Sequence, residues 1–144
     1  MRRLMLVATA IGVCIAVGGC GKGHVATATG PDLTRPETQA ATAAARAWIA
    51  KQHDHVTSAT AIGKHGTVEQ TNTGHKCTSG RLLQVELFGH FKQIAVSPPP
   101  GATDTAVTHV DLTVDAVSGQ TCLIGVGTGK VHPATDATVL DLTD

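Results

Sequence analysis

The sequence predicts an α+β fold in which one N-terminal helix packs on an antiparallel sheet of three to four strands. Two observations carry this prediction. Between residues 34 and 53, apolar residues recur at every third or fourth position, which is the spacing of one helix face. Over 81–96 and 105–116, apolar and polar residues alternate, which is the spacing of strands with one buried face. A helix that covers the apolar face of such a sheet leaves polar residues on the other face.

The first residues have the pattern of a secretory signal. Arg2 and Arg3 precede an apolar run from Leu4 to Val17, and a basic start followed by a short apolar stretch directs export. The run is shorter than the roughly 20 apolar residues of a membrane helix. We therefore expect residues 1–19 to be a removable signal peptide and not a permanent anchor.

Gly18, Gly19 and Cys20 follow this run and resemble the bacterial lipobox. The resemblance implies that a diacylglyceryl group is attached to Cys20, that the mature chain begins there, and that the protein is anchored to the extracytoplasmic face of the cell membrane. Two acyl chains hold a protein firmly, whereas one gives reversible binding. The alternative is an ordinary secretory signal in which a cysteine lies near the cleavage point by chance.

Four cysteines are present, and the lipobox resemblance accounts for two of them. Cys14 leaves with the signal peptide and Cys20 is acylated, so Cys77 and Cys122 remain as a pair in an oxidising compartment. We expect them to form a disulfide. In the chain-entropy account, closing a loop of about 45 residues stabilises the fold by roughly 4 kcal/mol. A redox or metal-binding pair is the alternative, without the C-x-x-C spacing that is typical of such pairs.

Residues 20–33 are rich in Gly, Thr, Ala and Pro without an apolar period, which predicts a flexible lipidated tether ahead of a single domain at 34–144. The helix should begin at Thr34, because Thr34 and Glu37 match a capping box. It should end between residues 53 and 55. Its apolar stripe consists of Ala41, Ala44, Ala45, Trp48 and Ile49.

Residues 81–96 give the strongest strand pattern, and 58–69 a weaker one that is typical of a strand or a hairpin. One face of the stronger segment carries Leu83, Val85, Leu87 and Phe91, and the other carries Gln84, Glu86, His90 and Lys92. The alternation changes phase after Phe91, which predicts a bulge or bend at Gly89 or at the step from Lys92 to Gln93. Residues 98–100 are all proline and should end the strand.

Residues 105–116 and 120–128 predict an antiparallel hairpin joined by a turn at Ser118 and Gly119. In the first strand one face carries Ala106, Val110, Leu112, Val114 and Ala116, and the other carries Val107, His109, Asp111, Thr113 and Asp115. Cys122 belongs to the inner face of the second strand. A short edge strand is expected within 137–142.

The segments 79–87 and 114–126 resemble those of small actinobacterial lipoproteins. The order of a helix followed by a meander of strands is similar to cystatin-like and PepSY-like envelope domains. This second likeness concerns topology alone, so it assigns no functional residue to this chain.

Composition and motifs exclude several classes of function. The chain has 11 Lys and Arg against 11 Asp and Glu, so it lacks the basic excess that nucleic-acid binding needs. It contains no G-x-S-x-G, no H-E-x-x-H and no glycine-rich phosphate loop, so no enzyme is predicted. We expect a non-catalytic binding or interaction module, or a domain that acts on a protein partner in the envelope.

Eight histidines point to a metal-binding alternative, because imidazole is a common ligand of zinc and copper(II). If the two main strands are neighbours, one outer face carries Glu86, His90, His109, Asp111 and Asp115. Of these, His90, His109 and Asp111 are the candidate zinc or copper(II) ligands, and His53 with His55 is a second candidate. The competing interpretation is that these side chains are solvated surface residues and that the protein has no cofactor.

Overall fold

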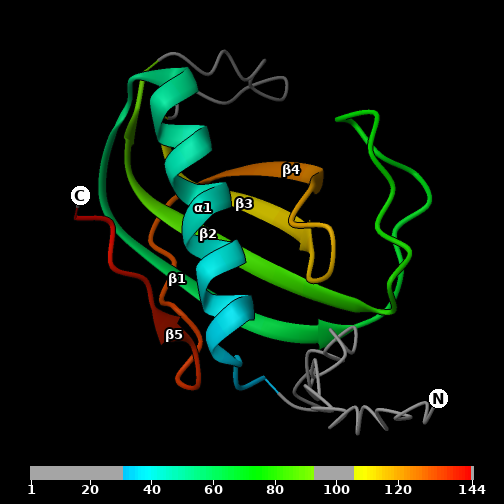
Figure 1. The fold of residues 1–144 in the computed structure, drawn as a ribbon. Helices are drawn as coiled ribbons and strands as arrows, with labels where there is room; N and C mark the ends of the chain where they lie inside the picture. Colours follow the sequence, from blue (N-terminus) through cyan, green and yellow to red (C-terminus); the bar gives the residue numbers. More distant parts are fainter. Residues whose placement is uncertain (1–30, 93–105, 144) are drawn as a thin grey trace, which may run out of the picture.

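The computed structural model describes residues 31–92 and 106–143. One helix precedes five strands: α1 (Arg35–Gln52), β1 (His55–His65), β2 (Arg81–Phe91), β3 (Val107–Asp115), β4 (Thr121–Thr128) and β5 (Thr138–Val139). The strands form one antiparallel sheet in the order β4-β3-β2-β1-β5, and α1 lies across one face of it (Figure 1). The α+β prediction is confirmed.

The predicted number of three to four strands is too low, because the described residues form five. The fifth strand is β5, which lies where a short edge strand is expected within 137–142 and pairs with β1 at Thr60 and Ala61. The segment 58–69, which gives only a weak strand pattern, overlaps β1, and β1 is an 11-residue strand. Its buried positions include Ala59, Ala61 and Gly63, and residues this small give a faint hydrophobic signal.

Both ends of α1 form as the sequence predicts. The Thr34 N–H donates to Glu37 Oε2 at 2.8 Å, and the Glu37 N–H donates to Thr34 Oγ1 at 3.4 Å, which completes the capping box. At the other end His53 is the C-cap in the left-handed conformation, with φ of 55°, and its N–H donates to Ile49 O at 2.9 Å. Glycine is the usual residue in this conformation, so the histidine is held there at a conformational cost.

The core lies between α1 and the inner face of the sheet. Ala41, Ala44 and Ala45 of the helix are buried, and their small side chains let the helix backbone approach the strands. The strand residues buried with them include Leu83, Val85, Leu87, Phe91, Val110, Leu112 and Val114. These are the inner faces that the alternation predicts for β2 and β3.

Val107 departs from the predicted pattern. The alternation assigns it to the polar face, but it is 3% exposed and belongs to the core. The pairing of β3 with β4 shifts register between Val107 and His109, and this irregularity returns Val107 to the inner face. A second register shift lies between Phe88 and Phe91 in the β2–β3 pairing, in the region of the bulge predicted near Gly89.

Asp115 is also placed on the wrong face by the alternation. Its side chain is buried and accepts hydrogen bonds from the backbone N–H groups of Ser79, Val117 and Ser118, each at 3.0 Å. Burial raises the pKa of the Asp115 carboxyl, but these hydrogen bonds outweigh it and hold the pKa below its ordinary value. Asp115 therefore fixes the β3–β4 turn and does not belong to the outer polar face.

A buried ion pair joins the start of α1 to the start of β2. Arg81 Nε donates to Glu37 Oε1 at 2.9 Å, with both side chains almost inaccessible to solvent. Arg81 Nη2 also donates to Asp32 O at 3.0 Å, and the guanidinium lies against Gly63, where any Cβ would overlap it. Burial raises the pKa of Glu37, but hydrogen bonds from Thr34 and Arg81 outweigh it and lower the pKa below its ordinary value.

The segment between β1 and β2, residues 66–80, is bound to the edge strand β4, and we call it the 66–80 loop. The predicted disulfide joins Cys77 to Cys122, with 5.8 Å between the Cα atoms. The Asn72 side chain donates to Ile124 O at 2.7 Å and accepts from the Ile124 N–H at 2.9 Å. Asn72 therefore satisfies backbone groups that an edge strand otherwise exposes.

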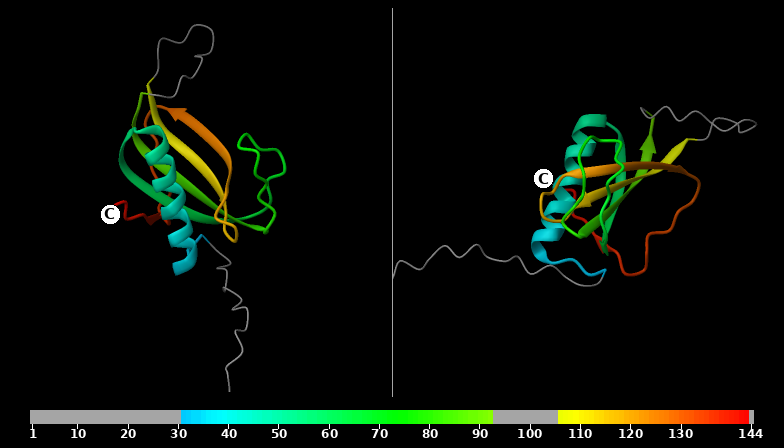
Figure 2. Two further views of the ribbon diagram at one scale, coloured as in Figure 1. Left: turned by 45° about the horizontal axis from the view of Figure 1, so that its top comes forward. Right: turned by 90° about the vertical axis from the view of Figure 1, so that its right-hand side faces the viewer.

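Figure 2 shows α1 on one side of the sheet and the connection from β4 to β5 on the other. After β5 the chain returns to the helix, where Arg46 Nη2 donates to Thr143 O. Residues ahead of α1 also contact the sheet, because Pro31 O accepts from the Gly63 N–H at 2.9 Å.

Several predictions concern residues outside the described ranges. These are the signal peptide, the acylated Cys20, most of the tether, and the proline turn within 93–105. Within the described ranges, no helix combines the length and the apolar character needed to cross a membrane.

Candidate functional site

A cleft of about 310 Å³, here named the Trp48 cleft, opens between α1, the 66–80 loop and the β3–β4 hairpin. Its lining residues are Ala44, Ala47, Trp48 and Lys51 from α1, Thr73 and His75 from the loop, and Leu112, Gln120, Thr121 and Ile124 from the hairpin. The α1 residues follow one another at steps of three, one and three, so they share one side of the helix. Leu112 and Ile124 are register partners on β3 and β4.

The wall opposite α1 is held in place by the contacts of the 66–80 loop. Thr73 Oγ1 donates to Thr121 O at 2.7 Å and accepts from the His75 N–H at 3.4 Å. The disulfide and the Asn72 side chain fix the same loop to β4. The Trp48 cleft is therefore formed by the fold itself, without a ligand.

Trp48 carries an unsatisfied hydrogen-bond donor. Its Nε1 is buried and has no hydrogen-bond partner within residues 31–92 and 106–143. An indole N–H can only donate, and buried tryptophans usually find an acceptor. Leaving the donor unpaired costs about 1–3 kcal/mol. An acceptor on a bound ligand would remove that cost.

One lysine and one histidine lie at the rim of the cleft. Lys51 lies in the last turn of α1 and His75 in the 66–80 loop, and both are exposed. None of the described residues that line the cleft is acidic. The rim therefore favours an anionic group over a cationic one.

Three histidines line one hollow in the structure, and two of them, His53 and His55, are the second metal candidate of the sequence. The register of β1 and β2 pairs His55 with His90, and His53 caps α1 just before β1. Together with Asp54 and Lys92 they line a second hollow of about 580 Å³, here named the histidine hollow. The Lys92 N–H donates to Asp54 Oδ1 at 3.2 Å. Asp54 Oδ2 is buried and has no partner in the part of the chain that the structure describes.

The predicted metal residues His90, His109 and Asp111 do not converge. Asp111 is the register partner of Glu86 and His109 that of Phe88, whereas His90 lies near the end of β2. Within residues 31–92 and 106–143, no three His, Cys, Asp or Glu side chains are placed so that they could share one metal ion. The alternation identified a common face correctly for these residues, but a face does not fix the separation between side chains on it.

His109 and Asp111 instead belong to a half-buried polar row on the outer face. The His109 ring lies over Gly127 of β4, where a Cβ would overlap it. Burial and the Asp111 carboxylate raise the pKa of Glu86, while His109 and Lys64 act in the opposite direction. The net result is that the pKa of Glu86 lies above its ordinary value.

Comparison with protein-family models, with curated proteins and with solved structures finds no match to this chain. Its function therefore has to be inferred from the chemistry of its own residues.

Proposed function

We propose that this protein is a membrane-anchored extracytoplasmic lipoprotein whose folded part is a non-catalytic binding module, with its ligand in the Trp48 cleft. The observation that supports this most strongly is that a ready-formed cavity is lined by Trp48, whose buried Nε1 has no hydrogen-bond partner among the described residues. Small-molecule sites are concave and mostly apolar, with a few polar groups that orient the ligand. The Trp48 cleft has each of these properties.

The lining residues define the class of ligand. Ala44, Leu112 and Ile124 offer apolar contacts, Trp48 offers a hydrogen-bond donor, and Lys51 offers positive charge. The volume of about 310 Å³ lies at the lower end of the range for ligand sites. The ligand that fits this description is a small molecule with an apolar body and one anionic end that accepts hydrogen bonds, such as a medium-chain carboxylate.

Binding without catalysis is supported by the state of the Thr73 hydroxyl in the cleft. The Thr73 hydroxyl already donates to the backbone carbonyl of Thr121, so it is engaged in holding the wall and is not poised as a nucleophile. Turnover of any ester, amide or glycoside by the purified protein in a hydrolase panel would overturn this part of the proposal.

The membrane is the partner that this proposal requires. The proposal of a membrane anchor rests on the basic and apolar leader and on the resemblance of Gly18, Gly19 and Cys20 to a lipobox. Intact-mass spectrometry of the native protein should find Cys20 at the N-terminus and carrying a diacylglyceryl group. An unmodified Cys20 would remove the anchor, and with it the proposed location, while leaving the cleft proposal to its own test.

Intrinsic fluorescence tests the cleft, because Trp48 is the only tryptophan of the chain. The full chain in phospholipid nanodiscs is titrated with octanoate and with octanol, a neutral molecule of the same length. We expect a saturable change in emission with octanoate and weaker binding of octanol, since octanol lacks the charge that Lys51 would attract.

Two lysine variants complete this experiment. Lys51→Gln should weaken octanoate binding about fivefold, as expected for loss of an exposed ion pair worth about 1 kcal/mol. Lys130→Gln, an exposed lysine that does not line the cleft, is the matched control and should bind as the wild type does. Equal weakening in both variants, or no emission change at all, would contradict the proposal.

A further inference from the structure

We propose that His55 and His90 form a chelating pair for a divalent transition-metal ion, with copper(II) preferred, in the histidine hollow. The site is separate from the Trp48 cleft and does not depend on it. His55 and His90 are direct partners in the antiparallel register of β1 and β2. Such partners project on the same face of a sheet with their Cβ atoms about 4.5–5.5 Å apart, so one ion can reach both imidazoles.

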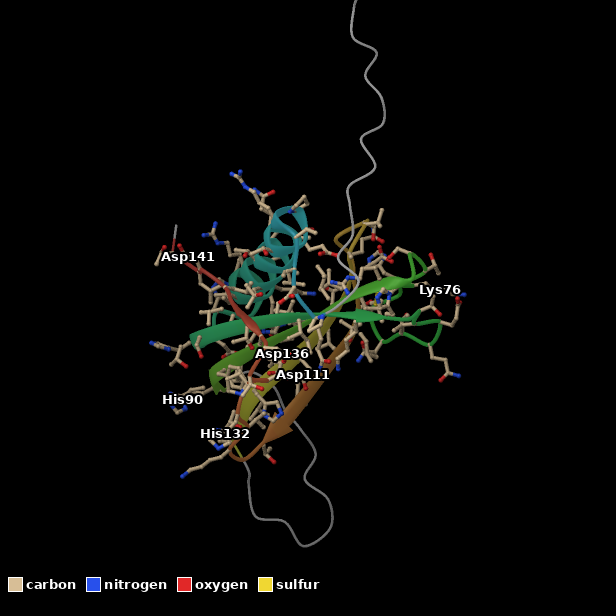
Figure 3. All side chains as sticks on the ribbon, turned by 90° about the horizontal axis from the view of Figure 1, so that it is seen from below. Lys76, His90, Asp111, His132, Asp136 and Asp141 are labelled. Carbon is tan, nitrogen blue, oxygen red and sulfur yellow. A yellow bond between two sulfur atoms is a disulfide. The ribbon has the colours of Figure 1, made fainter. Side chains whose placement is uncertain are left out.

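The backbone holds this pair in place before any ion arrives. Gly89, which precedes His90, lies so close to β1 that a Cβ on it would overlap His55 O. Both histidine side chains are exposed and both line the hollow. In Figure 3, His90 lies on the opposite side of the molecule from Lys76 of the 66–80 loop. The pair therefore combines fixed spacing with free access, and fixed spacing reduces the ordering cost of binding.

Asp54 supplies an independent reason to expect a cation in this hollow. Its Oδ1 accepts from the Lys92 N–H, but its Oδ2 is buried without a partner among the described residues. A carboxylate oxygen that has lost water and gained no donor is unfavourable. A divalent cation between the imidazoles would place a positive charge in the same hollow. The Lys92 ammonium, which also lines the hollow, is the competing cation.

The ligand set indicates which ion is preferred. Imidazole suits copper, nickel and zinc, and the general affinity order of divalent metals places copper(II) highest. No third ligand is in place for a shared ion within the described residues, so water completes the coordination. A site with two imidazoles and open positions suits the tetragonal geometry of copper(II). It should exchange its metal readily, unlike a closed structural zinc site.

This site combines His90 of the first sequence-based metal candidate with His55 of the second. His109 faces Phe88 in register and has its ring over Gly127, so it has a role within the sheet. The choice of His55 follows from strand pairing and not from strand alternation.

The test is copper(II) binding by the full chain in nanodiscs, measured by equilibrium dialysis and by electron paramagnetic resonance. His55→Gln and His90→Gln should each weaken copper binding about tenfold or more, because loss of even a supporting contact at a metal site costs 10–100-fold. The spectrum of the wild type should show nitrogen coordination that each variant reduces. All variants carry the same tether, so copper bound there is common to all and cancels in the comparison.

His109→Gln is the matched control, because it removes a histidine from a neighbouring strand and should leave copper binding unchanged. Lys92→Met removes the competing ammonium but keeps the backbone N–H, and should strengthen copper binding. Melting of each variant without metal confirms that the fold is retained. Binding that survives in both His55→Gln and His90→Gln, or that falls equally in His109→Gln, overturns the proposal. Tighter binding of zinc than of copper(II) overturns the stated preference.

Discussion

The two ends of the β1–β2 pair are held in different ways. At the end that leads into the 66–80 loop, the contacts are covalent or buried. They are the disulfide between Cys77 and Cys122, the ion pair between Arg81 and Glu37, and the three backbone hydrogen bonds to the Asp115 carboxylate. At the other end His55 and His90 are exposed, and the Lys92 N–H reaches Asp54 Oδ1 at 3.2 Å. We call the end next to the 66–80 loop the tied end and the end with His55 and His90 the open end.

This difference separates the residues that stabilise the fold from those available for recognition. Polar groups at the tied end already have partners, and they hold the 66–80 loop as a wall of the Trp48 cleft. A group that is paired inside a protein gains little by binding a ligand, because it must first give up its partner. Trp48 Nε1 and Asp54 Oδ2 have no such partner in the described residues, and each belongs to a residue that lines a hollow.

Removing the disulfide should have the largest effect on stability. The paired change Cys77→Ser with Cys122→Ser should lower the free energy of unfolding by about 4 kcal/mol, because the unfolded chain regains the entropy of a long loop. Urea denaturation measures this loss. An exposed change at the open end, His90→Ala, should move the same quantity by less than about 0.5 kcal/mol.

The variant without the disulfide, Cys77→Ser with Cys122→Ser, also distinguishes the two proposed sites. Without the disulfide, the 66–80 loop loses its covalent tie to β4, so octanoate binding should weaken, whereas copper(II) binding in the histidine hollow should stay within about twofold under conditions in which the protein remains folded. Equal losses at both sites would mean that the two ends are not independent.

Breaking the buried ion pair between Arg81 and Glu37 should cause the second-largest loss in the free energy of unfolding. Arg81→Met leaves the Glu37 carboxylate buried without its partner, and should cost about 3 kcal/mol. The double variant Arg81→Met with Glu37→Gln removes the unpaired charge and should recover part of that loss. A double variant no more stable than Arg81→Met would show that burial of the charge is not the cause.

Acid should weaken the contacts that Glu37 and Asp115 make at the tied end. The folded-state pKa values of Glu37 and Asp115 are lowered, so each stabilises the fold above its unfolded pKa of about 4, and this stabilisation is lost as the pH falls through the lowered folded value. Urea denaturation between pH 7 and pH 2.5 should show a constant free energy of unfolding above about pH 5 and a decline below about pH 4. Glu37→Gln should be less stable at pH 7 and should decline less on acidification.

The parts of the fold that depend on local periodicity could be predicted from the sequence. The capping box of Thr34 and Glu37, the alanine stripe of α1 and the inner face of β2 all depend on residues a few positions apart. Val107 and Asp115 were misplaced because a register shift and a set of backbone hydrogen bonds override the alternation there. The strand β1 was underestimated because small residues occupy its buried positions.

The candidate sites were harder to predict, because both depend on long-range pairing. His55 meets His90 only through the register of β1 and β2, which the intervening 66–80 loop does not determine. Trp48 belongs to the apolar stripe that the helix spacing predicts, and it does pack against the core. Its place in a cleft depends on the 66–80 loop folding back onto β4, and the cysteine pair was the sequence signal for that contact.

The smallest predicted effect lies at the open end. His53 is the left-handed C-cap of α1, a conformation that favours glycine. His53→Gly should therefore raise the free energy of unfolding by about 0.5 kcal/mol, since the relief of backbone strain exceeds the added flexibility of the unfolded chain. Urea denaturation with His55→Gly as the control should show the opposite sign for the control, because His55 lies in a strand.

The indole N–H resonance of Trp48 tests the central claim most directly. With a single tryptophan, the 1H–15N spectrum of the full chain contains one indole cross-peak. On titration with octanoate we predict a saturable downfield shift of the indole proton, as Nε1 gains the acceptor that the fold does not supply, and a smaller shift in Lys51→Gln. A cross-peak that stays in place, or that moves equally with octanol, would contradict a ligand site at the Trp48 cleft.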